Sequence, residues 1–112
     1  MGLGRMTRFI DIIQVVNVKD AEGFGSAPAD VVVASVRSYV EGRHGSERWA
    51  NRAAFSTANA LFRFRKIPGV EVTTKMFIIE SGKRYRIVSV EDVRGKGMYY
   101  ECLCETSEGT VY

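Results

Sequence analysis

The side chains that most often carry chemistry in proteins are few in this chain: one histidine, His44, and two cysteines, Cys102 and Cys104. The cysteines are separated by one residue, so in an extended strand both point to the same face, a geometry poorly suited to a disulfide. Zinc sites usually need a two-residue gap and further ligands, and His44 is far away in the sequence. We therefore expect no metal site and two free thiols that serve as small core side chains, as suits a reducing compartment.

The sequence also offers few residues that could form an acid–base site. Glu91 and Asp92 are neighbours, and neighbours on a strand point to opposite faces, which makes them weak candidates for an acid–base pair. His44 lies in a glycine-bounded segment without an evident orienting partner. The glycines around Arg94 are not followed by a helix, so they predict a hairpin turn and not a phosphate-binding loop. The sequence thus predicts no catalytic residue, no cofactor and no enzymatic activity.

Clusters of basic side chains are more informative. They are Arg43, Arg48 and Arg52; Arg63, Arg65 and Lys66; and Lys83, Arg84 and Arg86. Arginines displayed without surrounding acids contact phosphates without sequence specificity, whereas cations on strands also serve as solvated, edge-protecting charges. In the first cluster Trp49 lies between two arginines, a combination that is also typical of protein-interface anchors. The net charge of +3 is compatible with a polyanion nearby but does not require one.

These residues belong to one domain, because 112 residues leave no room for a second core. β-branched and alternating patterns predict six strands, at 7–18, 31–40, 58–66, 76–80, 83–93 and 98–106. Residues 20–30 are expected to form a loop, and the long central segment 42–57 a loop holding one short helix that Ser46 caps. The fold class is therefore mainly β, a small antiparallel barrel or sandwich of about six strands.

Alternation also predicts which side chains face the core. On the expected strands, Phe62 and Phe64 face opposite to Arg63 and Arg65; Val32, Ala34, Val36 and Val40 share one face; and Tyr85, Ile87 and Ser89 share another. Phe62 and Phe64 should thus be core, with Arg63 and Arg65 on the surface. The main alternative function is a single-stranded nucleic-acid-binding barrel of the oligonucleotide-binding type, which would use these two aromatics as a stacking platform.

Targeting signals are not expected. The apolar stretch 9–18 is interrupted by Asp11, Gln14 and Asn17, unlike a signal peptide, and no stretch approaches the length of a membrane span. We therefore expect a protein that is made in the cytoplasm and has no membrane partner.

The second half of the chain resembles a known family. The residues are Arg63-Phe-Arg65, then the short apolar strand and turn at 76–82, then Tyr85 to Val93 in the pattern Y-x-I-x-S-V-x-D-V, then Leu103 to Glu105 in the pattern L-x-C-x-E. In this order and spacing they are similar to the head–tail joining, or head-completion, proteins of long-tailed bacteriophages. The first half is similar through the strand at 31–40 and the variable loop after it, although a tryptophan that the family often carries in that strand is missing here.

The resemblance implies a small antiparallel β-barrel that assembles with copies of itself into a ring, usually dodecameric, in the virion at the head–tail interface. Such a ring closes the DNA-filled head below the portal and adaptor and docks the tail or tail-completion protein. In some relatives the long loop projects into the channel near the packaged double-stranded DNA. Carried onto this chain, the loop is 42–55, with Arg43, Arg48 and Arg52 as channel- or DNA-proximal groups and Trp49 as an interface anchor.

Overall fold

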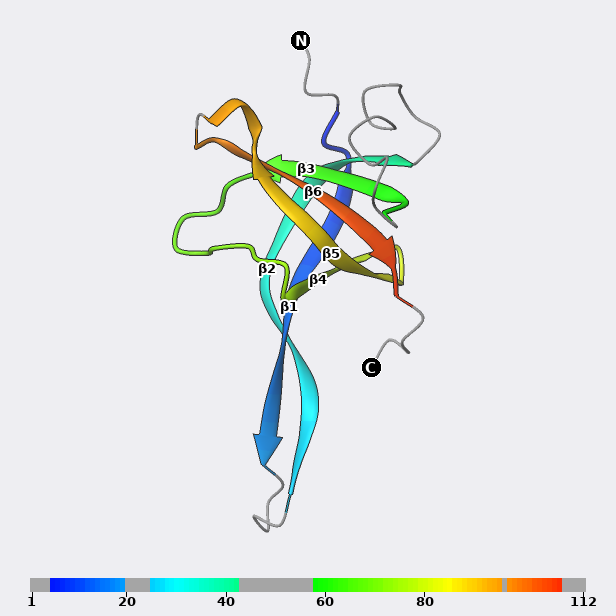
Figure 1. The fold of residues 1–112 in the computed structure, drawn as a ribbon, viewed down its shortest axis with the longest axis vertical. Coiled ribbons are helices and arrows are strands. Elements are labelled where there is room, and N and C mark those ends of the chain that lie inside the picture. Colours follow the sequence, from blue (N-terminus) through cyan, green and yellow to red (C-terminus); the bar gives the residue numbers. More distant parts are fainter. Residues whose placement is uncertain (1–4, 20–24, 43–57, 96, 108–112) are drawn as a thin grey trace.

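The computed structural model describes residues 5–19, 25–42, 58–95 and 97–107, and Figure 1 shows their arrangement. The strands are β1 (Arg8–Lys19), β2 (Ser26–Gly42), β3 (Ala60–Arg65), β4 (Met76–Glu80), β5 (Lys83–Asp92) and β6 (Tyr99–Thr106), with one 3-10 turn, η1 (Val93–Gly95). They close into an antiparallel barrel in the order β1-β2-β3-β6-β5-β4. The predicted mainly β barrel is confirmed, while the predicted short helix lies outside the described residues.

The barrel interior is formed by alternate residues of the strands, as the alternation predicted. Its buried members include Ile10 and Ile12 of β1, Phe62 and Phe64 of β3, Ile78 of β4, Tyr85 and Ile87 of β5, and Cys102 and Cys104 of β6. Phe62 meets Tyr85 edge to face, with ring centroids 5.1 Å apart. The core is therefore built mainly from β-branched and aromatic side chains, which pack well on a pleated surface.

Two register shifts change the expected faces. Between β1 and β2 the register shifts after Ile12, so that Val33 is the extra residue, and Val32 turns out to solvent. Between β5 and β6 a similar shift brings Val90 and not Ser89 against the core. The predictions for Val32 and Ser89 were wrong because a bulge inserts one residue and reverses the alternation beyond it.

A two-stranded ribbon leaves the barrel. We call it the arm and define it as residues 15–19 of β1 and 26–30 of β2, paired from Val15–Asp30 to Lys19–Ser26. Among the described residues β4 joins β1 only as far as Gln14, so these arm strands pair with each other alone. The arm extends below the barrel in Figure 1 and gives the molecule principal extents of 53 × 29 × 23 Å. The prediction of a loop over 20–30 was thus wrong for residues 26–30.

The turns between β4 and β5 and between β5 and β6 lie where the glycines of the sequence predicted them. β4 and β5 are joined at Ser81 and Gly82, both of which have positive φ, 53° and 78°. Glycine tolerates this region far better than other residues. The turn predicted around Arg94 contains Gly95 and Gly97 at positive φ, but it includes η1 and is longer than a tight hairpin.

Candidate interaction surfaces

The central loop carried the sequence-predicted site. Arg43, Arg48, Trp49 and Arg52, together with His44, lie outside the described residues. The structure does describe both ends of this segment, because β2 ends at Gly42 and the chain resumes at Ala58. These ends are joined through the sheet: β2 pairs with β3 from Tyr39 to Gly42, and the backbone N–H of Asn59 donates to the carbonyl of Cys104 at 2.9 Å.

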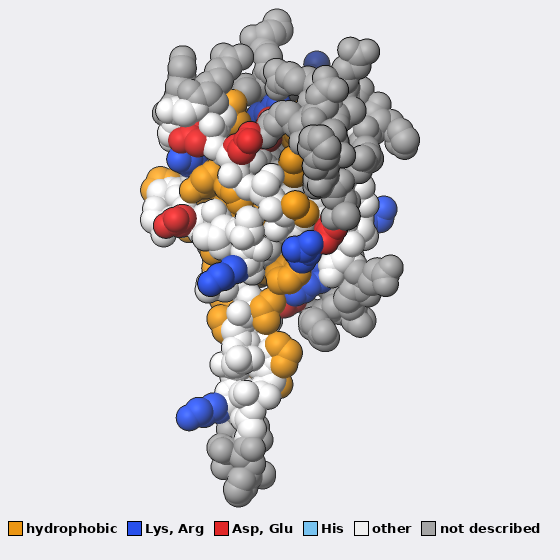
Figure 2. Space-filling view, viewed as in Figure 1, with side chains coloured by type: hydrophobic (Ala, Val, Ile, Leu, Met, Phe, Trp, Pro, Cys, Tyr) orange, Lys and Arg blue, Asp and Glu red, His pale blue; other side chains and the backbone are white. Residues whose placement is uncertain are grey.

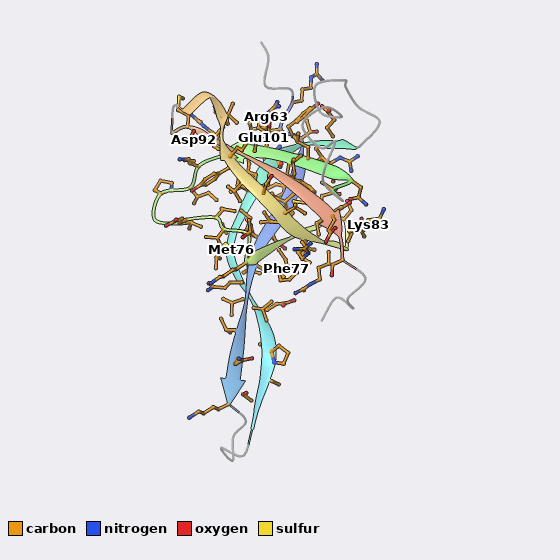
Figure 3. All side chains as sticks on the ribbon, in the orientation of Figure 1. Arg63, Met76, Phe77, Lys83, Asp92 and Glu101 are labelled. Carbon is orange, nitrogen blue, oxygen red and sulfur yellow. The ribbon has the colours of Figure 1, made fainter. Side chains whose placement is uncertain are left out.

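A buried ion pair lies on the same strands, three residues along the ladder from the pairing of Gly42 with Ala60. Arg63 of β3 donates from Nε at 2.9 Å and from a terminal nitrogen at 2.6 Å to one carboxylate oxygen of Glu101 on β6. Both side chains are almost fully buried, at 7% and 4% exposure. Figure 3 labels both residues in the upper part of the barrel, where they are paired across β3 and β6. Arg63 therefore does share a face with Arg65, as predicted, but the prediction that it lies on the surface was wrong.

Further contacts fix the orientation of this pair. The guanidinium of Arg63 lies over the ring of Tyr39, 5.1 Å from its centroid, and the Tyr39 hydroxyl donates to Glu41. The hydroxyl of Ser38 donates to the carbonyl of Arg63 at 3.2 Å. A small second cluster (Ala58, Leu61 and Leu103, with Tyr39) packs on the same outer side, opposite Phe62 and Phe64. We call Tyr39, Arg63, Glu101 and this cluster the platform; it supports both ends of the segment that holds the predicted loop.

Two further arginines of the strand clusters, Arg84 and Arg86, also have acidic partners. Arg84 donates to both carboxylate oxygens of Asp30, at 2.7 and 3.3 Å, and its guanidinium lies 4.2 Å from the ring centroid of Phe77. Arg86 donates to Glu105 from Nε at 2.8 Å. The interpretation of the strand clusters as phosphate-binding sites required arginines without acidic neighbours. Arg63, Arg84 and Arg86 each have an acidic partner, so this interpretation no longer applies to them. Arg65 remains exposed, as predicted, and lies over the ring of Tyr99.

The Arg84–Asp30 pair also braces the arm. Asp30 is the last arm residue of β2, and its side chain is 17% exposed, while that of Arg84 is 6% exposed. The pair joins the root of the arm to β5, on the opposite side of the barrel sheet from the core. A bidentate arginine–carboxylate contact fixes direction as well as distance. The arm therefore leaves the barrel at a defined angle.

Asp92 organises the turn between β5 and β6. Its carboxylate accepts from Lys66 Nζ at 3.0 Å and from the backbone N–H of Gly97 at 2.9 Å. The hydrogen bond from Lys66, followed by that from Gly97, holds the pKa of Asp92 below its ordinary value of 3.8. Asp92 is thus a structural carboxylate and not half of an acid–base pair.

The lowered pKa of Asp92 predicts a pH effect. Its stabilising contribution is fully present above the unfolded value of about pH 4 and is lost as the pH falls through the lower folded value. We expect Asp92→Asn to lower the melting temperature at pH 6, and the difference from wild type to shrink as the pH falls below about 4. Thermal unfolding between pH 6 and pH 2 measures it, with Glu71→Gln at an exposed site as the control for lost charge. A difference that stays constant over this range would contradict the role of Asp92.

The cysteines and the two core phenylalanines behave as the sequence predicted. Cys102 and Cys104 are free and buried, and burial raises the pKa of Cys102 to about 12 and that of Cys104 well above its ordinary value. Both thiols therefore stay protonated and unreactive at neutral pH. Phe62 and Phe64 are 0% exposed, so neither ring is available for stacking on a base. The alternative function, a single-stranded nucleic-acid-binding barrel, therefore lacks the exposed aromatic rings on which bases would stack.

Two findings concern other kinds of site. Within the described ranges, no group of histidine, cysteine and carboxylate side chains is arranged to hold a metal ion. In the same part of the chain, no helix is long and apolar enough to cross a bilayer.

The arm and its root expose apolar side chains. Val18 in the arm and Val31, next to Asp30 at its root, are 50% and 43% exposed, and Figure 2 shows hydrophobic side chains along the arm below the barrel. Exposed apolar patches on a soluble domain mark interaction sites. This surface was not predicted from the sequence, because Ser26, Ala27 and Pro28 are typical of a loop.

The described residues thus form a closed antiparallel barrel from which a two-stranded arm projects. The model of the phage head completion protein family matches residues 1–107. The chain therefore belongs to the phage head completion protein family, which confirms the resemblance drawn from its sequence. It is a structural head protein and a component of the phage particle.

Two solved structures share this fold. One is a chain in the virion of a native gene transfer agent particle, with 23% identity, a TM-score of 0.62, and coverage of 95% of this chain and 99% of that one. The other is the solution structure of protein SF1141 from Shigella flexneri 2a, with 14% identity, a TM-score of 0.72, and coverage of 98% and 100%. At these identities the likeness shows the fold. A search of curated protein sequences finds no match.

Proposed function

We propose that copies of this chain form a ring at the head–tail interface, where they close the DNA-filled head below the portal and adaptor and present a docking surface for the tail. The observation that carries the proposal is the family match over residues 1–107. The fold supports it, because the barrel has a complete core of its own while the arm leaves apolar side chains exposed. A subunit of this kind folds alone and gains its remaining contacts by assembly.

The proposal extends to the central loop. Arg43, Arg48 and Arg52 would approach the packaged double-stranded DNA, and Trp49 would anchor the loop against a neighbouring protein. A ring repeats each contact in every copy, so a weak basic contact in one subunit is multiplied without any new chemistry. The platform supports the assignment, because a loop that contacts DNA in a defined position has to leave the barrel from well-packed strands.

DNA-filled, tail-less heads made without this protein provide the test. Purified wild-type protein is expected to co-sediment with these heads and to slow the release of their DNA, measured as nuclease-sensitive DNA over time. Heads of the same preparation emptied of DNA control for binding to the capsid alone. Failure of the protein both to bind the filled heads and to retain their DNA would overturn the proposed function.

A further inference from the structure

The arm has one face without any charge. In register, Val16 and Val18 of β1 lie opposite Ala29 and Ala27 of β2, and Val31 lies next along β2 opposite Gln14. We call Val16, Val18, Ala27 and Ala29, together with Val31 just beyond the arm, the arm face. On β1 it continues the alternation of Ile10 and Ile12, whose side chains fill the barrel core. The core-forming pattern thus runs on for several residues after the strands have left the barrel.

The other face and the edges of the arm differ. The opposite face mixes Val15 and Val32 with Asn17, Lys19, Ser26 and Asp30. Pro28 offers no N–H to a further strand, and proline and lysine on an exposed edge discourage strand addition. A two-stranded ribbon is at best marginally stable alone in water. The arm is therefore built to be covered on its apolar face and not extended at its edges.

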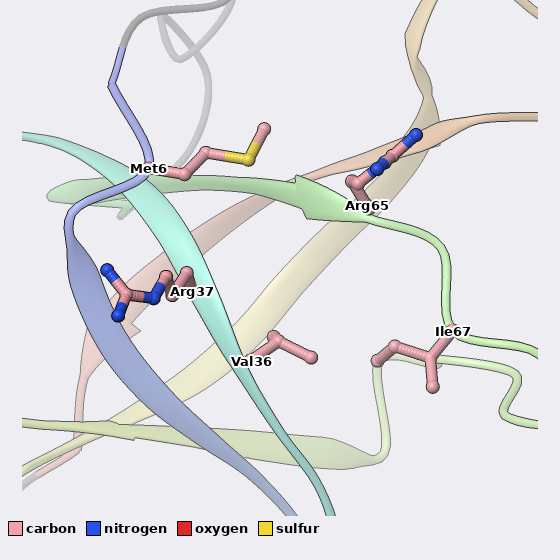
Figure 4. A pocket seen from close by; sticks show the side chains of 5 residues that line it. All are labelled: Met6, Val36, Arg37, Arg65 and Ile67. Carbon is pink, nitrogen blue, oxygen red and sulfur yellow. The ribbon is translucent and has the colours of Figure 1, made fainter.

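An apolar hollow lies elsewhere on the same chain. Met6, Val36 and Ile67 line it together with Arg37 and Arg65, and its volume is about 370 Å³ (Figure 4). Nearly all of the surface in this hollow is apolar, because the two arginines contribute mainly the carbon part of their side chains. The hollow is open to solvent, so an apolar side chain from outside has access to it.

The geometry prevents an arm from filling the hollow of its own chain. Val36 and Arg37 lie on β2 opposite Ile10 and Phe9, at the far end of the same two strands that form the arm. The strand from Phe9 to Lys19 is about 33 Å long at roughly 3.3 Å per residue. An arm that is part of these strands cannot turn back over them, so the contact requires another molecule.

We propose that the arm face of one copy docks in the hollow lined by Met6, Val36 and Ile67 of a second copy of this chain. The two surfaces are different, so the contact is head-to-tail, and repetition of a head-to-tail contact closes a ring when the rotation allows it. The inference deepens the proposed function, on which its biological setting rests, by naming the contact between ring neighbours.

Engineered cysteines test this contact directly. The double variant Val18→Cys/Ile67→Cys places one thiol on the arm face and one in the hollow, and Cys102 and Cys104 are too buried to interfere. Under mild oxidation we expect a ladder of covalent oligomers on non-reducing gels, and no ladder from either single variant. The matched control is Asn17→Cys/Ile67→Cys, which moves the first thiol to the opposite face of the same strand and should give no ladder. Circular dichroism confirms that each variant is folded.

The reaction is run on concentrated protein in solution and on protein bound to the filled heads. A ladder in either setting supports the contact. A dimer from Val18→Cys alone would show arm-to-arm pairing, and a link from the thiol of that variant to a different head or tail protein would identify another occupant; both overturn the inference. Folded protein that binds heads and retains DNA but gives no ladder in either setting leaves the proposed function standing and overturns the contact. If the protein forms the ladder but neither binds the filled heads nor retains their DNA, the contact between copies stands and the proposed function is overturned.

Discussion

Glutamine in place of Glu101 is expected to lower the free energy of unfolding by about 3 kcal/mol, the low end of the range for breaking a buried ion pair. The substitution keeps the shape of the side chain but removes the negative charge to which Arg63 donates twice. The arginine cannot lose its own charge to compensate, since a guanidinium stays protonated in proteins. Urea unfolding followed by circular dichroism measures the loss.

Two further variants separate the charge from other effects. Glu105→Gln on the same strand removes a carboxylate whose partner, Arg86, is 51% exposed, and we expect a loss of at most about 1 kcal/mol. In Arg63→Met/Glu101→Leu both charges are replaced by apolar side chains, and most of the stability lost in Glu101→Gln should return. Equal losses in Glu101→Gln and Glu105→Gln would refute the account of the platform.

The sequence contained enough to predict the barrel interior. Phe62 and Phe64 alternate with charged residues, and Cys102 and Cys104 share a strand face, so period-two alternation alone assigned all four to the core. Several strands with turn signals between them predicted a small barrel or a sandwich, and the structure shows that the sheet closes into a barrel. Local patterns suffice for these residues because successive side chains of a strand point to opposite faces of the sheet.

Features that depend on pairing between distant residues were not predictable. Arg63 looked like a surface cation because Glu101 is 38 positions away, and Arg84 lies 54 positions from Asp30. The bulge at Val33 has no signal of its own in a run of three valines, so the face of Val32 was assigned wrongly. The arm was missed because serine, alanine and proline at 26–28 are typical of loops. A proline is tolerated there since β2 has no further strand beside it along the arm.

The second large effect is expected on DNA retention when the arginines of the central loop are replaced. If Arg43, Arg48 and Arg52 each neutralise one phosphate, the logarithm of the DNA-binding constant falls with the logarithm of the salt concentration, with a slope of roughly −0.9 per phosphate. For three phosphates the affinity of one subunit for DNA then weakens about 40-fold between about 50 and 200 mM salt. Replacement of all three by glutamine should remove this dependence, by about one unit of slope per arginine. We expect the triple variant to bind filled heads like wild type but to release DNA faster at 50 mM salt, with a rate that changes little up to 200 mM.

A matched control is needed because the triple variant also lowers the net charge from +3 to 0. Arg5, Arg8 and Lys75 are exposed cations of the described barrel, and their joint replacement by glutamine changes the net charge by the same amount. If the loop acts locally on the DNA, only the loop variant leaks. If both variants leak equally, the overall charge of the protein and not the loop retains the DNA. If neither leaks while both bind, closure depends on the shape of the ring alone, and the assignment of Arg43, Arg48 and Arg52 to the DNA is wrong.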